Sequence, residues 1–290
     1  MTSPSHSPVI GVFDSGFGGL TVLRSLLARM PAARFAFIGD TARLPYGSKS
    51  RRTIARYAAE SAQFLTQEQG AEFLVIACNT ASALALDDIK QAVSVPVLGV
   101  IEPGAAAAKA SSTTGDVLVI ATDATVQSHA YAAACQAHGL RALEKACPLL
   151  VPLVEEGWTS HDVTRNVIRI YLNELLADAH AKGMTPDTLV LGCTHYPLLR
   201  PLIEEAVPAG MRVIDSADST ADAAAQQFKS AQSGDGKIEP ATSAQELSTT
   251  DPETNLVRCF ATDSVEKFAR LGSRFLGRPT GPVTLVDLGG

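Results

Sequence analysis

The sequence has no long uncharged apolar run and no excess of positive charge. No stretch approaches the roughly 20 apolar residues that a membrane-spanning helix needs, so we expect no membrane partner. Asp and Glu number 30 against 24 Lys and Arg, and the net charge of −6 argues against a nucleic-acid partner, because a phosphate backbone calls for a basic face. The start lacks the basic and apolar regions of a signal peptide, and we therefore expect a cytoplasmic protein.

Familiar cysteine patterns are missing as well. The five cysteines are odd in number and include no C-x-x-C pair, so neither a disulfide framework nor a thiol redox site is favoured. The Cys and His residues do not follow the spacing of a structural zinc site, and we expect no metal. A buried inert thiol is the ordinary state of a single cysteine, so a functional role has to follow from local context.

Short apolar runs alternate with longer helical patterns along the chain. Runs such as Val9–Asp14 and Phe73–Cys78 are rich in Val, Ile, Leu and Phe without polar alternation, which is typical of strands buried on both faces of a parallel sheet. Helical patterns, such as Thr125–His138, separate them. The alternation predicts an α/β fold with two similar doubly wound parallel-sheet domains that face each other across a cleft.

Candidate crossing points divide the chain into these two domains. We assign residues 1–98 and 210–290 to the first domain and residues 99–209 to the second. Within the first domain, residues 229–255 are rich in Ser, Thr, Gln, Gly and Asp and hold few large apolar residues. This composition predicts a surface insertion.

Two cysteines occupy matching contexts. Cys78 ends an apolar run and is followed by Asn79 and Thr80, whereas Cys193 ends a second run and is followed by Thr194 and His195. Ligands of open α/β sheets bind beyond the carboxyl ends of the strands. Backbone N–H groups and the dipole of the following helix should lower the pKa of each thiol. The match predicts a functional pair, and the other three cysteines are expected to be structural.

A glycine-rich turn follows the first predicted strand. Asp14 and Ser15 precede glycines at 16, 18 and 19, which do not give the G-x-G-x-x-G spacing, and no Gly-Lys-Ser/Thr follows. Asp14 would also repel a phosphate. We therefore expect an amino-acid ligand, with Asp14 near its ammonium or beside a cysteine and backbone N–H groups for its carboxylate.

Further polar groups follow other predicted strands. Pro45, Tyr46 and Gly47 form either a plain tight turn or a backbone clamp on a carboxylate. Thr125 is either an ordinary helix cap or a ligand contact. His195 is either a capping residue or, like Asp14, an acid that tunes a neighbouring thiol.

Five motifs, in order at strand ends, together resemble those of bacterial glutamate racemases. They are Asp14-Ser-Gly-Phe-Gly-Gly-Leu, Gly39-Asp-Thr, Leu44-Pro-Tyr-Gly, Ala77-Cys-Asn-Thr-Ala-Ser and Leu191-Gly-Cys-Thr-His-Tyr-Pro-Leu. The resemblance runs from Val9 to about Phe228 and resumes near Phe260. It implies that Cys78 and Cys193 are the catalytic acid/bases, assisted by Asp14 and His195. The substrate contacts that it implies, including the turn at 45–47, are Asp14, Ser15, Pro45, Tyr46, Gly47, Asn79, Thr80, Thr125, Thr194 and His195.

The same resemblance implies an activity. It is the racemisation of L-glutamate to D-glutamate by a two-base mechanism, which supplies D-glutamate for peptidoglycan synthesis, in an enzyme that is usually a homodimer. Neither a Lys Schiff-base pattern nor a phosphate site for pyridoxal phosphate is evident, and we expect no cofactor. The residues leave two alternatives open: an aspartate racemase on the same scaffold, and a non-catalytic module that binds an anion.

Overall fold

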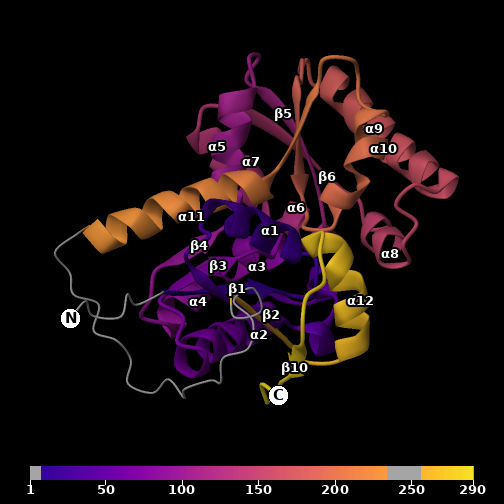
Figure 1. The fold of residues 1–290 in the computed structure, drawn as a ribbon. Coiled ribbons are helices and arrows are strands. Elements are labelled where there is room, and N and C mark those ends of the chain that lie inside the picture. The colour runs from indigo at the N-terminus through magenta and orange to yellow at the C-terminus, as the bar shows by residue number, and fades with distance from the viewer. Residues whose placement is uncertain (1–7, 234–255, 290) are drawn as a thin grey trace.

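The computed structural model describes residues 8–233 and 256–289, which form two parallel sheets. The first sheet has six strands in the order β10-β9-β2-β1-β3-β4, and the second has four in the order β6-β5-β7-β8. The predicted architecture of two parallel-sheet α/β domains is confirmed (Figure 1). The strands are β1 Val9–Asp14, β2 Arg34–Gly39, β3 Phe73–Ile76, β4 Val97–Gly99, β5 Asp116–Ala121, β6 Arg141–Ala146, β7 Thr188–Gly192, β8 Arg212–Asp215, β9 Val257–Ala261 and β10 Val283–Leu285.

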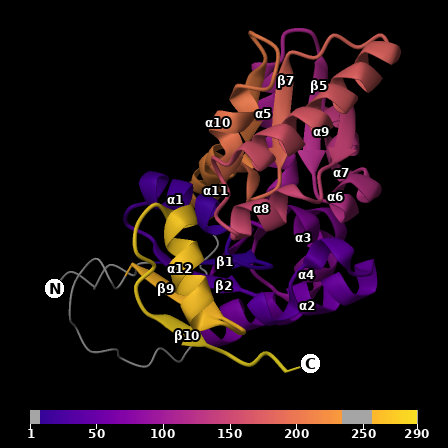
Figure 2. The same ribbon diagram turned by 90° about the vertical axis from the view of Figure 1, so that its right-hand side faces the viewer.

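Helices cover both faces of each sheet. In the two views, α5 and α9 flank the four-stranded sheet, whereas α2 and α12 lie on the six-stranded one (Figures 1 and 2). The α-helices are α1 Leu20–Arg29, α2 Arg51–Gln63, α3 Asn79–Leu84, α4 Leu86–Ala92, α5 Ile101–Ser111, α6 Asp123–Ser128, α7 Ala130–Ala137, α8 Leu150–Glu155, α9 Asp162–Ala181, α10 Arg200–Glu204, α11 Ser216–Ser233 and α12 Val265–Leu276. Short 3-10 turns span Thr41–Arg43 (η1), Tyr46–Ser48 (η2) and Tyr196–Leu199 (η4), and a π-helical turn, η3, spans Phe64–Glu68.

The two domains share apolar packing. One continuous cluster contains Val12 and Val75 of the first sheet together with Leu118 and Leu189 of the second. Helix α11 adds to this joint, because it packs against α1 of the first domain and α5 of the second. Burial of this apolar surface stabilises the arrangement of the two sheets as well as each sheet alone.

The position of β8 corrects the expected domain boundary. We assigned residues from 210 onward to the first domain, but β8 pairs with β7, with Val190 opposite Ile214, in the second sheet. The boundary at 210 is therefore too early for this strand. The pattern of apolar runs shows that a strand is present but does not show which sheet it joins.

The predicted surface insertion at residues 229–255 lies mostly outside the described residues. Its first five residues, 229–233, continue α11. Within residues 8–233 and 256–289, no helix combines the length and the apolar character that crossing a membrane requires.

Candidate active site

The carboxyl ends of the central strands of both sheets meet at one place. Thr80 follows β3 in the first sheet, and its Oγ1 lies 3.0 Å from Oγ1 of Thr122, which follows β5 in the second sheet. Oγ1 of Thr125, at 3.3 Å, completes a triangle of hydroxyls. Gly47 faces the same threonine, since a Cβ there would lie 3.4 Å from Cβ of Thr122. Residues that the sequence placed on separate strands thus come together, and Thr122 joins them without having been predicted.

The glycine loop after β1 packs against the residues that follow Cys193. A Cβ on Gly18 would lie 2.7 Å from Nδ1 of His195, so only glycine fits this close approach. The hydroxyl of Thr21 points to the carbonyl oxygen of Thr194 at 3.5 Å. The need for glycine here comes from contact between the two domains.

Cys78 lies in a buried, acidic environment. Its Sγ is 3.3 Å from Oγ of Ser15 and 3.4 Å from the amide nitrogen of Ala81. Burial and the charge of Asp14 raise the pKa of its thiol to about 12, although the hydrogen bonds from Ser15 and Ala81 oppose this rise. The prediction that the helix N-terminus lowers this pKa is wrong, because desolvation and a nearby carboxylate outweigh the backbone N–H groups.

Cys193 lies beside a positively charged group. Its Sγ is 3.9 Å from Nδ1 of His195, and Nε2 of the same ring is 3.4 Å from Oε1 of Glu155 at the end of α8. Burial disfavours the charged imidazole, but the neighbouring Cys193 sulfur and Glu155 carboxylate outweigh this effect and raise the pKa of His195 to about 10. Lys267 of α12 lies 3.4 Å from the other carboxylate oxygen of Glu155. His195 is therefore an imidazolium at neutral pH.

The carboxylate of Asp14 interacts electrostatically with both Cys78 and His195. Burial raises its pKa, although His195 and the amides of Gly16 and Gly19 oppose the rise. One carboxylate oxygen accepts a hydrogen bond from the Gly16 amide at 2.9 Å.

Three buried polar atoms at this place have no hydrogen-bond partner among the described residues. They are Oδ1 of Asp14, Nδ2 of Asn79 and Nε2 of His195, which has only the Glu155 carboxylate nearby at 3.4 Å. An unsatisfied buried polar atom costs about 1–3 kcal/mol, so such atoms are uncommon in a folded core. The Asp14 oxygen is an acceptor and the Asn79 nitrogen a donor, which are the groups that the ammonium and the carboxylate of an amino acid require.

The turn after β2 contributes a buried tyrosine. The hydroxyl of Tyr46 donates to Oδ2 of Asp40 at 2.5 Å, and burial together with the charge of Asp40 raises the tyrosine's pKa. Tyr46 and Cys78 belong to the same buried apolar cluster of the first domain. Pro45, by contrast, is exposed. Asp40 and Glu155 were not singled out from the sequence. Asp40 belongs to the Gly39-Asp-Thr motif, whereas Glu155 stands in no motif.

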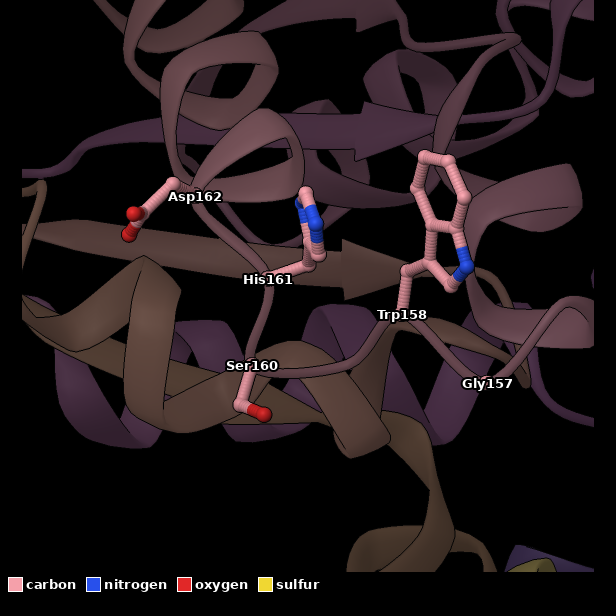
Figure 3. Close-up of a pocket in the computed structure, with 5 residues that line it drawn as sticks. All are labelled: Gly157, Trp158, Ser160, His161 and Asp162. Carbon is pink, nitrogen blue, oxygen red and sulfur yellow. The ribbon is translucent and has the colours of Figure 1, made fainter.

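A surface hollow lies away from this place. It is lined by one loop between α8 and α9, where Trp158 stacks on His161 with ring centroids 4.8 Å apart (Figure 3). None of the predicted site residues lines it. In the part of the chain that the structure describes, no three His, Cys, Asp or Glu side chains gather as metal ligands would.

The profile of the Asp/Glu/hydantoin racemase family matches residues 10–224, and the chain belongs to this family. Among its relatives, the glutamate racemase of Koribacter versatilis (strain Ellin345) is 53% identical over 98% of each chain, and that of Geobacter metallireducens is 42% identical over 96% of each.

Solved structures give the same result. The glutamate racemase isoform RacE1 of Bacillus anthracis has a TM-score of 0.82 at 34% identity, covering 98% of this chain and 99% of its own. The glutamate racemase of Francisella tularensis, in complex with D-glutamate, has a TM-score of 0.81 at 33% identity, covering 97% and 98%. The resemblance to glutamate racemases seen in the motifs is confirmed.

Proposed function

We propose that this protein interconverts L- and D-glutamate, with Cys78 and Cys193 as its two bases. The observation that carries the proposal is that Asp14 interacts electrostatically both with Cys78, which follows β3, and with His195, whose ring lies beside the sulfur of Cys193 after β7. Racemisation inverts Cα, so one proton leaves from one face while another arrives on the opposite face. Two fixed groups on opposite sides perform both transfers without turning the substrate.

The surroundings of the two sulfurs suggest which one is protonated before the reaction begins. A cation beside Cys193 stabilises negative charge on its sulfur, whereas Cys78, with a pKa raised to about 12, starts as a thiol. Starting from this state, the Cys193 thiolate takes the Cα proton, and the electron pair of that bond moves into the carboxylate. The Cys78 thiol then delivers its proton to the other face, which leaves Cys78 as thiolate and Cys193 as thiol. The reverse direction restores the start.

The carbanion at Cα needs stabilisation from the protein's own groups. Nδ2 of Asn79 is a buried donor suited to the carboxylate on which charge develops, and Oδ1 of Asp14 is an acceptor suited to the ammonium. The remaining proposed substrate contacts are Ser15, Tyr46, Gly47, Thr80, Thr125, Thr194 and the turn at Pro45. Positioning of base and substrate can supply about 7–11 kcal/mol of the barrier lowering.

The relatives' names support glutamate as the substrate. Aspartate racemase structures, such as that of Picrophilus torridus at 18% identity, share the fold alone. We further propose that the D-glutamate supplies peptidoglycan synthesis. The homodimer and the cytoplasmic location stay predictions.

Circular dichroism of the amino acid tests this function. We expect L-glutamate and D-glutamate to converge on the same racemic signal without added cofactor, and aspartate to change far more slowly. A Cys193→Ser preparation, purified identically, controls for a contaminating racemase. Constant signals with glutamate would contradict the proposal, and faster turnover of aspartate would replace it with the aspartate alternative.

A further inference from the structure

Tyr131 is a buried tyrosine of α7 that no motif identified. Its side chain is fully buried. The ring fits between two glycines: a Cβ on Gly104 of α5 would lie 3.1 Å from Cε1, and a Cβ on Gly192 of β7 would lie 3.0 Å from Cε2. The ring therefore has a fixed place in the second domain, beside the end of the strand that carries Cys193.

The hydroxyl of Tyr131 contacts a residue of the first domain. It donates to Oδ1 of Asn79 at 2.7 Å, and the nearby side chain of Ser216, the first residue of α11, acts to lower the pKa of the phenol. Burial raises the pKa of this phenol, so the group stays a donor throughout the neutral range. In the structure, the proton of Tyr131 is directed to Asn79.

This contact decides which end of the Asn79 amide is free. Because Oδ1 is held by Tyr131, Nδ2 is the end left without a partner among the described residues. An amide turned by 180° would instead present an oxygen, which repels a carboxylate.

We infer that Tyr131 is a positioning residue, which fixes the Asn79 amide with its N–H donors toward the substrate carboxylate. This inference rests on the proposed function, because it assigns the ligand of Nδ2 to the carboxylate of glutamate. It adds a residue of the second domain that acts on the reaction through a residue of the first.

Substitution of Tyr131 by Phe keeps the ring and removes only the hydroxyl. We expect kcat/KM for glutamate to fall about 10- to 100-fold, because a misdirected Asn79 amide loses its hydrogen bond to the charged carboxylate of the substrate. Ser216→Ala, which leaves the phenol in place, should give a smaller fall in the same direction. Tyr171→Phe is the matched control, since the hydroxyl of this α9 residue accepts a hydrogen bond from the amide of Leu149, just before α8, and makes no contact with Asn79. It should leave kcat/KM unchanged.

A double-mutant cycle separates positioning from general support of the fold. In an Asn79→Ala background, Tyr131→Phe and Ser216→Ala should each change kcat/KM by less than about twofold, because the amide through which they act is gone. Losses that multiply with that of Asn79→Ala would overturn the inference, as would unchanged kinetics of Tyr131→Phe. If the wild type itself does not racemise glutamate, the proposed function fails first, and the two failures are thus distinguishable.

Discussion

The two halves of the site surround similar sulfurs with opposite charges. Cys78 is accompanied by Asp14, and its pKa is raised to about 12 by burial and by that carboxylate. Cys193 is accompanied by His195, whose pKa of about 10 keeps it protonated. The sequence contexts of the two cysteines match, yet their electrostatic surroundings differ. In the proposed reaction, this difference implies an asymmetric resting state, in which Cys78 is protonated and Cys193 lies beside a cation.

The largest expected effect comes from removing either sulfur. Cys78→Ser and Cys193→Ser should each lower kcat by about 10³-fold or more in both directions, because acid–base catalysis on one face is lost and the other face cannot complete inversion alone. Circular dichroism measures both directions. Cys259→Ala, which removes a buried thiol from β9, is the control and should keep near-wild-type activity. If one of the serine variants keeps substantial turnover, the paired roles are wrong.

The imidazolium beside Cys193 predicts a pH-dependent stability. His195 has a folded pKa raised from 6.5 to about 10, so its contribution is fully present below about pH 6.5 and is lost as the pH rises through 10. We expect the free energy of unfolding to fall by on the order of 3 kcal/mol over this window, relative to His195→Gln. Urea denaturation at a series of pH values measures it. Parallel curves for the two proteins would show that His195 is not stabilised as a cation.

Glu155 supports the positive charge of His195 beside Cys193. Glu155→Gln keeps the shape and removes the charge that supports His195, so we expect kcat/KM to fall about 10-fold and its alkaline limb to move to lower pH. Glu144→Gln is a suitable control, since that carboxylate is partly buried against His129 on another part of the second domain. A pH profile identical to that of the wild type would show that Glu155 does not support the charge of His195.

The smallest expected effect concerns Cys78. Asp14→Asn removes the negative charge near this thiol and lowers its pKa, so alkylation of Cys78 by iodoacetamide at pH 8 should become roughly 3- to 10-fold faster. Mass spectrometry of the labelled peptides gives the rate at each cysteine, and buried Cys135 serves as the internal control. A slower or unchanged reaction at Cys78 would mean that Asp14 does not set its charge state.

Much of the fold follows from the pattern of apolar runs. The run Val9–Asp14 coincides with β1, whose six residues are all buried, because a strand covered on both faces needs apolar side chains throughout. Strand β6 was not predicted, since its residues Arg141–Ala146 lie at the sheet edge, half-buried or exposed. An edge strand has only one neighbour and leaves no continuous apolar run.

Other features depend on tertiary contacts. We expected one helix over Thr125–His138, but His129 adopts a left-handed conformation, with φ of 54°, and separates α6 from α7. Packing of α8 against the η4 turn within the second domain brings Glu155 to His195, and nothing in the local sequence of α8 indicates this contact. The candidate cysteines could be identified because they follow strands, whereas their charge states could not, because burial and Asp14 act through space.

Isotope exchange during a single conversion tests the two-sulfur account most directly. L-glutamate is incubated with the protein in deuterium oxide. At low conversion the two enantiomers are separated, and the deuterium content of each is measured by mass spectrometry. The account predicts D-glutamate carrying deuterium at Cα beside L-glutamate that still carries protium, because each face exchanges with its own sulfur. D-glutamate that retains the original protium, or L-glutamate that gains deuterium as fast as product forms, would contradict it.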